Sequence, residues 1–200
     1  MAPPMDNFHL FELINAPAEL HPTRLLLALL VARWLIWLLP PALGILWLRA
    51  GNDTRRELLH LIVAAMCAVV VAELVRLAWP HPRPSALRLG HHYLAHAGDS
   101  GLPSDQVTVV WALALAALWT HRLSVLCFPL LTAGLLLGLG RVYVGVNFPY
   151  DILAALPVAL AGALAAWGLR HLLAPLATRV IASYDRCARY LQARWRGMTA

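Results

Sequence analysis

Two long apolar runs of this chain are joined by the stretch Gly140-Arg141-Val142-Tyr143-Val144-Gly145-Val146-Asn147-Phe148-Pro149-Tyr150-Asp151. An arginine, a small amide and a carboxylate therefore meet at one junction between two segments of membrane-spanning length. Such a combination at one depth indicates a site for an anionic group. The simpler interpretation is that Arg141 reaches toward the lipid headgroups and that Asn147 or Asp151 caps a helix. This stretch alone does not decide between the two.

The composition of the whole chain indicates an integral membrane protein. Of its 200 residues, 60% are hydrophobic and 13% are charged, and the apolar residues come in long runs. We therefore predict one all-α domain, an integral membrane helical bundle that spans residues 1–200. The net charge of +6 comes from sixteen arginines and no lysine. In a membrane protein this pattern marks cytoplasmic faces more often than a nucleic-acid-binding surface.

The apolar runs predict about five transmembrane helices, which form a bundle over residues 24–170. The expected spans are Leu25 to Leu48, Leu58 to Trp79, Ser104 to Trp119, Leu123 to Leu139 and Ile152 to Leu169. Residues 1–23 carry an apolar face too short to cross a bilayer, so an interfacial helix is predicted there. Residues 171–200 alternate arginines with apolar residues and predict an amphipathic helix on the cytoplasmic surface. Pro40 and Pro41 are expected to kink the first span.

Two charged residues lie inside the predicted spans. Arg33 falls within the first span, and Glu73 lies about two turns before the end of the second. An intramembrane charge is costly unless it faces a partner or a wet cavity. Because antiparallel neighbouring helices would place the two residues at similar depth, we predict that Arg33 and Glu73 form a pair.

Two further polar stretches accompany the first one. Two arginines lie seven positions apart in the stretch Arg76-Leu77-Ala78-Trp79-Pro80-His81-Pro82-Arg83-Pro84. A turn and a helix N-terminus, which is a natural anion-binding element, open the apolar segment that begins with Gly101-Leu102-Pro103-Ser104-Asp105-Gln106. In order and spacing, the three stretches resemble the three motifs of the type 2 phosphatidic acid phosphatase superfamily. Those motifs read basic-x6-Arg-Pro, Pro-Ser-Gly/Asp-His and Ser-Arg-x5-His-x3-Asp.

Within that superfamily, the chain is most similar to the bacterial undecaprenyl-diphosphate phosphatases. The similarity includes Leu10-Phe11-Glu12-Leu13-Ile14-Asn15-Ala16 near the start, and His91, His96 and Asp99 before the second motif. It implies a multi-pass protein of the bacterial inner (cytoplasmic) membrane. The arginines outside the motifs gather in the first and third loops and after the fifth span, which marks that side as cytoplasmic. The three motifs fall on the opposite side, so the site is expected to face the periplasm or the exterior.

The resemblance assigns roles to the motif residues. Arg76, Arg83 and Arg141 would form a guanidinium cage around one phosphoryl group, because the planar guanidinium matches phosphate oxygens and stays charged. Ser104 would add neutral donors at a helix start, and Asp151 would orient the side chain at position 147. His91 and His96 would serve the lipid headgroup or the loop structure. The alternatives are arginines solvated at the headgroup level and a plain helix cap at Ser104.

The chain departs from the family pattern at both motif histidines. Gln106 stands at the general-acid position and Asn147 at the nucleophile position, with milder departures at Arg76 for lysine and Gly140 for serine. An imidazole can attack phosphorus, whereas the amide nitrogen of asparagine has a delocalised lone pair and is a poor nucleophile. The sequence thus predicts a site that holds phosphate but is impaired at the nucleophile. A histidine of the outer loop is a further candidate nucleophile: His81, His91, His92 or His96.

Two hypotheses of function follow. The first is a phosphatase, independent of metals and cofactors, that converts undecaprenyl diphosphate to undecaprenyl phosphate during recycling of the cell-envelope lipid carrier. The second is a catalytically inactive lipid-phosphate-binding form, either a natural degenerate paralogue or an engineered variant. A structural or transport protein would leave the three motifs unexplained. Expected partners are an isoprenoid lipid diphosphate or phosphate and membrane lipids, but no nucleic acid; the sequence makes no prediction of the oligomeric state.

Overall fold

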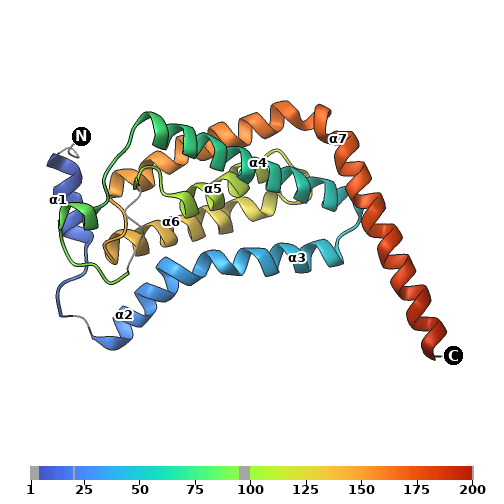
Figure 1. Cartoon of the computed structure of the whole chain (residues 1–200), viewed down its shortest axis with the longest axis horizontal. Coiled ribbons are helices and arrows are strands. Elements are labelled where there is room, and N and C mark those ends of the chain that lie inside the picture. Colours follow the sequence, from blue (N-terminus) through green and yellow to red (C-terminus); the bar gives the residue numbers. More distant parts are fainter. Residues whose placement is uncertain (1–4, 20, 95–99, 200) are drawn as a thin grey trace.

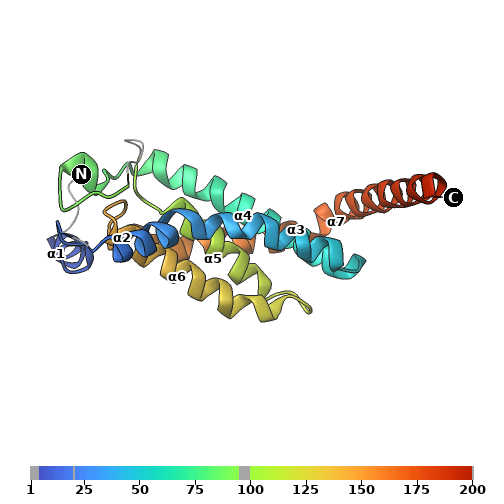
Figure 2. The same ribbon diagram turned by 90° about the horizontal axis from the view of Figure 1, so that it is seen from below.

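The computed structural model describes residues 5–19, 21–94 and 100–199, and in this part of the chain every regular element is a helix. The long helices lie side by side along one axis (Figures 1 and 2). The predicted helical membrane bundle is confirmed. Among the described residues, four helices are long and apolar enough to cross a membrane: Pro22–Arg49, Asn52–Ala78, Ser124–Tyr143 and Pro149–Trp195.

The first of these four segments, Pro22–Arg49, which we call the first rod, is irregular in its middle. It consists of α2 (Pro22–Leu29), a π-helical turn (Leu30–Trp34), a 3-10 turn (Leu35–Leu38) and α3 (Leu39–Arg49). Pro40 and Pro41 lie in the first turn of α3 and cannot donate backbone hydrogen bonds to the preceding turn, so the regular pattern is lost there. The helix type changes between Leu30 and Leu38, before the prolines, whereas the predicted kink stays a prediction. Most side chains of this rod are exposed, as expected for a surface that faces lipid.

The short helix α5 (Asp105–Ala117) packs against α4 (Asn52–Ala78), α6 (Cys127–Tyr143) and α7 (Pro149–Thr199). It corresponds to the predicted third span but has 13 residues. At roughly 1.5 Å per residue it measures about 20 Å, less than the roughly 30 Å of a hydrocarbon core. Nine of its residues are buried, so the surrounding helices, and not α5, meet most of the lipid. Short 3-10 turns, η3 (Pro84–Leu87) and η4 (Ser124–Leu126), interrupt the loops.

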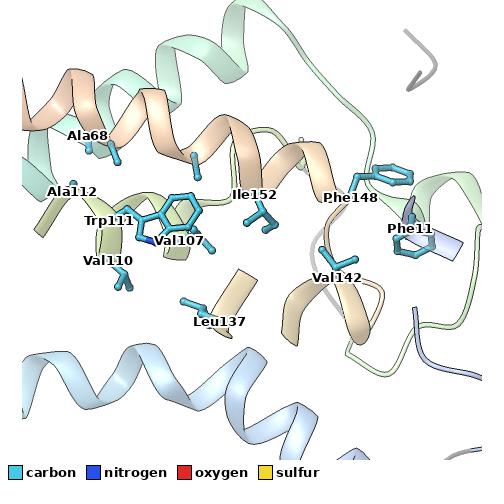
Figure 3. Packing of buried hydrophobic residues seen from close by; sticks show 12 residues of the cluster. Phe11, Ala68, Val107, Val110, Trp111, Ala112, Leu137, Val142, Phe148 and Ile152 are labelled. Atoms are coloured by element: carbon cyan, nitrogen blue, oxygen red, sulfur yellow. The ribbon is translucent and has the colours of Figure 1, made fainter. Parts of the chain in front are cut away.

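The bundle core is built from aliphatic side chains, aromatic rings and small residues. Figure 3 shows Val107, Val110 and Trp111 extending from α5, while Phe11 and Phe148 face each other near one end. Their rings meet edge to face with centroids 5.2 Å apart. These contacts join α1 (Met5–Ile14) to the start of α7.

The helix α1 covers only part of the predicted interfacial segment 1–23, since Pro22 already belongs to the first rod. It is attached to the bundle through Asn7, whose Oδ1 accepts the backbone N–H of Tyr150 at 3.1 Å. Just after the helix, Asn15 Nδ2 donates to the carbonyls of His91 and Tyr143, and its Oδ1 accepts the N–H of His91 at 2.7 Å. Asn15 therefore connects the N-terminal segment, the outer loop and the end of α6.

The predicted fifth span and tail helix are one continuous helix, α7, of 51 residues. Its second half turns away from the bundle axis (Figure 1), and it contains Pro175, a residue type that bends helices. This half is held against α4 by an ion pair between Arg55 and Asp185 at 3.0 Å. Arg55 also lies over the Tyr184 ring, 4.4 Å from its centroid.

The predicted pair between Arg33 and Glu73 is wrong. Glu73 accepts a hydrogen bond from Arg76, three residues further along α4, at 2.9 Å. Arg33 is exposed and lies 5.7 Å from the centroid of the adjacent Trp34 ring. Similar depth in two antiparallel helices does not by itself make two side chains meet, and Arg33 also lies within the π-helical turn, where the regular α-helical geometry does not apply.

Candidate functional site

The three polar stretches meet at the end of the bundle where α4 and α6 end and α5 and α7 begin. The loop between α6 and α7 turns sharply at Gly145, where φ is +81°. A Cβ there would lie 2.3 Å from the carbonyl oxygen of His91, so only glycine fits both the backbone conformation and the close approach. This turn directs Asn147 back toward Arg141.

Asn147 is fully buried and uses its whole amide group. Its Oδ1 accepts a hydrogen bond from Arg141 Nε at 2.8 Å. Its Nδ2 donates to the carbonyl of Gly101 at 2.9 Å and to Asp151 Oδ2 at 3.1 Å. Since a guanidinium can only donate, and a carbonyl and a carboxylate can only accept, these partners fix the orientation of the amide.

Arg141 is the centre of the network and is only 3% exposed. Besides its bond to Asn147, it donates from Nη1 to Gln106 Oε1 at 2.9 Å. The side chains at both positions where the family pattern has histidine therefore contact the same guanidinium. The arginine is thus held in place in part by two amides, which carry no charge of their own.

Asp151 lies behind Asn147 and is also fully buried. Its Oδ2 accepts the backbone N–H of Phe148 at 2.8 Å in addition to the Asn147 amide. Its backbone carbonyl accepts the N–H of Ser104 at 3.1 Å, which fastens the start of α5 to the start of α7. Asp151 thus caps a helix, as the simpler interpretation proposed, and also holds the side chain at position 147.

Two further arginines of the predicted cage approach the same region. Arg83 is 2% exposed and donates from Nη1 to the carbonyl of Val146 at 3.3 Å. Arg76 forms ion pairs with Glu73 and with Asp105, the residue before Gln106. The phosphate-binding and catalytic roles of these side chains stay predictions.

Several buried polar atoms around this network have no hydrogen-bond partner within the described chain. They include Ser104 Oγ, Asp151 Oδ1, His81 Nδ1 and Arg76 Nε. Buried polar groups are normally paired, and those that are not deserve a specific explanation. The serine hydroxyl and the arginine N–H can donate to the oxygens of a bound phosphate, and so can the histidine nitrogen when it carries a proton.

The outer-loop histidines differ in their positions. The ring of His81 packs against Phe148, with centroids 6.3 Å apart, and is 9% exposed. His91 and His92 are exposed; His91 bonds Asn15 through its backbone, and His92 Nδ1 lies 3.1 Å from the carbonyl oxygen of Gly145. His96 and Asp99 lie outside the described residues.

Sequence reasoning gave no site role to Gly101 or Asp105. A Cβ on Gly101 would lie 2.8 Å from Asp151 Oδ2, and its carbonyl holds Asn147, so the position needs glycine. Asp105 neutralises part of the charge on Arg76. The signal in the sequence is the position of Gly101 directly before Leu102-Pro103-Ser104, in the turn that leads into α5. Within the described part of the chain, no group of three or more histidine, cysteine or carboxylate residues is arranged to hold a metal ion.

These features define a helical membrane protein with a buried, arginine-rich polar site at one end of its bundle. The sequence model of the PAP2 (type 2 phosphatidic acid phosphatase) superfamily matches residues 57–174, which is more than half of the chain. The chain belongs to the PAP2 superfamily, as its three motifs predicted.

Named relatives agree with this assignment. YbjG of Escherichia coli (strain K12), described as a candidate undecaprenyl-diphosphatase, is 34% identical over 160 residues, which is 80% of each chain. The undecaprenyl-diphosphatase BcrC of Bacillus subtilis (strain 168) is 30% identical over 140 residues, 70% of this chain and 72% of BcrC. The crystal structure of LpxE from Aquifex aeolicus shares the fold, with a TM-score of 0.67 at 22% identity, over 84% of this chain and 99% of LpxE.

Proposed function

We propose that this protein binds the diphosphate headgroup of an isoprenoid lipid, undecaprenyl diphosphate, and hydrolyses it far more slowly than relatives that carry the motif histidines. The substrate class is suggested by the two undecaprenyl-diphosphatases among its relatives. Binding is supported by Arg83 and Arg141, which are buried beside unpartnered donors at one end of the bundle.

The observation that carries the proposal is the bonding of Asn147. In the family reaction, a histidine at this position would attack the terminal phosphorus and carry the phosphoryl group. In this chain the Asn147 nitrogen has both hydrogens engaged, with Gly101 and Asp151, and its lone pair is delocalised into the amide. The oxygen is occupied by Arg141. No atom of this side chain is left to act as a nucleophile.

Gln106 weakens turnover in a second way. Its Oε1 accepts from Arg141, and an amide cannot deliver a proton to a leaving group at neutral pH. General-acid assistance is typically worth about 10²- to 10⁴-fold. The leaving group in this reaction is a lipid phosphate, which is stable as an anion and needs a proton less. We therefore expect the missing general acid to lower the rate by less than the missing nucleophile does.

The orientation that fits this function places the site on the outer face of a bacterial cytoplasmic membrane. Ten arginines lie away from the motifs, at the other end of the bundle and after residue 169: Arg49, Arg55, Arg56, Arg122, Arg170, Arg179, Arg186, Arg189, Arg194 and Arg196. Such clusters favour the cytoplasmic side. The site would then meet lipid headgroups in the outer leaflet.

Binding and turnover can be measured on the same purified protein. In detergent micelles, undecaprenyl diphosphate should bind, undecaprenol without phosphate should not, and phosphate release should stay close to the background. Arg83→Gln should weaken the binding of the diphosphate, because it removes a buried cation. Equal binding of the lipid with and without phosphate would contradict the proposal, and rapid phosphate release would support the phosphatase hypothesis in its place.

A further inference from the structure

We propose that the end of the bundle opposite the candidate site contains a second binding site, for an anionic phospholipid. A cavity of about 550 Å³ lies there, lined by residues of α4, of α7 and of the loop after α5. Its volume falls within the range of roughly 300 to 1,000 Å³ typical of ligand sites. None of its lining residues belongs to the three motifs.

The position of the cavity along the bundle corresponds to the other membrane surface. Arg56 lines the cavity and Arg76 belongs to the candidate site, and both lie on α4. The roughly 20 residues between them correspond to about 30 Å of helix, the thickness of a hydrocarbon core. Trp119 and Trp167 also line the cavity, and tryptophan is enriched at the level of lipid headgroups.

The charges at the cavity favour an anion. Arg56 and Arg170 both line it, and among the described residues neither forms an ion pair. Arg170 lies over the Trp167 ring, 3.9 Å from its centroid, which holds the guanidinium in position. The single acidic lining residue, Glu57, is engaged elsewhere, since its carboxylate accepts the backbone N–H groups of residues 121–123.

The rest of the lining is suited to a hydrocarbon chain. Leu59 and Val63 of α4 face the cavity together with Leu173 and Val180 of α7. A soluble anion would leave this apolar surface uncovered, whereas a phospholipid covers it with an acyl chain while its phosphate meets the arginines. Basic pockets between helices at a membrane surface are suited to anionic headgroups. The occupant that matches both features is therefore an anionic phospholipid.

The test compares dioleoylphosphatidylglycerol with dioleoylphosphatidylcholine, each titrated into the full-length protein in detergent, with lipid retention measured by native mass spectrometry. The unmodified protein should retain the anionic lipid more tightly. The double variant Arg56→Gln/Arg170→Gln should bind it roughly 20-fold more weakly, since a basic residue near an anionic headgroup contributes about fivefold. Undecaprenyl diphosphate binding at the opposite end should not change.

The matched control is the double variant Arg179→Gln/Arg194→Gln, which removes the same charge from exposed positions of α7 outside the cavity. It should leave phosphatidylglycerol binding within about twofold, because such solvated charges contribute little. Equal losses in the two double variants would show a general charge effect and overturn the site. So would equal retention of the two lipids by the unmodified protein. If soluble glycerol 3-phosphate competes as strongly as the lipid does, the site binds a small anion and the phospholipid proposal is wrong.

Discussion

Replacing Arg141 with alanine tests the centre of the candidate site. Arg141 is 3% exposed and donates to Asn147 at 2.8 Å and to Gln106 at 2.9 Å. The substitution removes the cation that we expect to contact the phosphate, and it leaves two amide oxygens without their partner. Affinity for the lipid diphosphate and stability should therefore both fall, for separate reasons.

The expected loss of affinity is large. Truncating one member of a buried, hydrogen-bonded charge pair costs about 2–5 kcal/mol, which corresponds to roughly 30- to 5,000-fold in the dissociation constant. Each orphaned acceptor, Asn147 Oδ1 and Gln106 Oε1, lowers the free energy of unfolding by about 1–3 kcal/mol unless water replaces the guanidinium. Binding must therefore be measured at a temperature where the Arg141→Ala protein is still folded.

The assay is a titration of undecaprenyl diphosphate into detergent-solubilised protein, with Arg122→Ala as the control. Arg122 is an exposed arginine that pairs with Asp53 at 3.2 Å, away from the motifs, and its loss should leave the affinity unchanged. An Arg141→Ala protein that is folded and binds the diphosphate within about threefold of the unmodified protein would refute the assignment, because even the smallest expected loss is larger.

Two further predictions concern stability and can be followed by thermal unfolding in detergent. Gly162→Ala should lower the free energy of unfolding by about 1–3 kcal/mol, since its Cβ would lie 2.5 Å from the Ala68 backbone. Gly168 has nothing within 4 Å of the position that a Cβ would occupy, so Gly168→Ala should leave the free energy of unfolding unchanged or raise it by up to about 1 kcal/mol. The reversed order of the two variants would contradict the packing of α4 against α7. Glu57→Gln should lower the free energy of unfolding by about 1–3 kcal/mol, because the carboxylate accepts backbone N–H groups of residues 121–123. Glu12 is exposed, so Glu12→Gln should lower it by less than about 0.5 kcal/mol. Equal effects of the two substitutions would contradict a stabilising role of the Glu57 contact.

The convergence at the candidate site could be predicted from the sequence because its residues lie at helix ends. Arg76, Ser104, Arg141 and Asp151 each stand within a turn of a helix terminus. In an antiparallel bundle, alternate termini share one end, so the order and spacing of the motifs are enough to bring these residues together. The orientation of Asn147 could not be predicted in this way, since it depends on the Gly101 carbonyl, which comes from another loop.

The features that the sequence did not predict depend on tertiary packing. The pairing of Arg33 with Glu73 is predicted from their similar depth in two antiparallel helices, but Arg33 lies in a π-helical turn and Glu73 pairs with Arg76 of its own helix. The tail is predicted as a separate amphipathic helix because its arginines alternate with apolar residues, yet the last helix continues through Pro175 into the tail. The cavity opposite the candidate site forms between α4, α7 and the loop after α5, and these three groups of lining residues are distant from one another in the sequence.

The most direct test of the account is the rate of phosphate release from undecaprenyl diphosphate, measured side by side for the unmodified protein and for Asn147→His. Loss of a catalytic nucleophile costs up to about 10⁶-fold, so restoring histidine should raise the rate by roughly 10³- to 10⁶-fold, even if the larger ring costs about 1–3 kcal/mol of packing. Adding Gln106→His should contribute about 10²-fold more. If the unmodified protein already releases phosphate rapidly and Asn147→His leaves the rate unchanged, position 147 is not the catalytic centre, and the buried ring of His81 becomes the residue to replace.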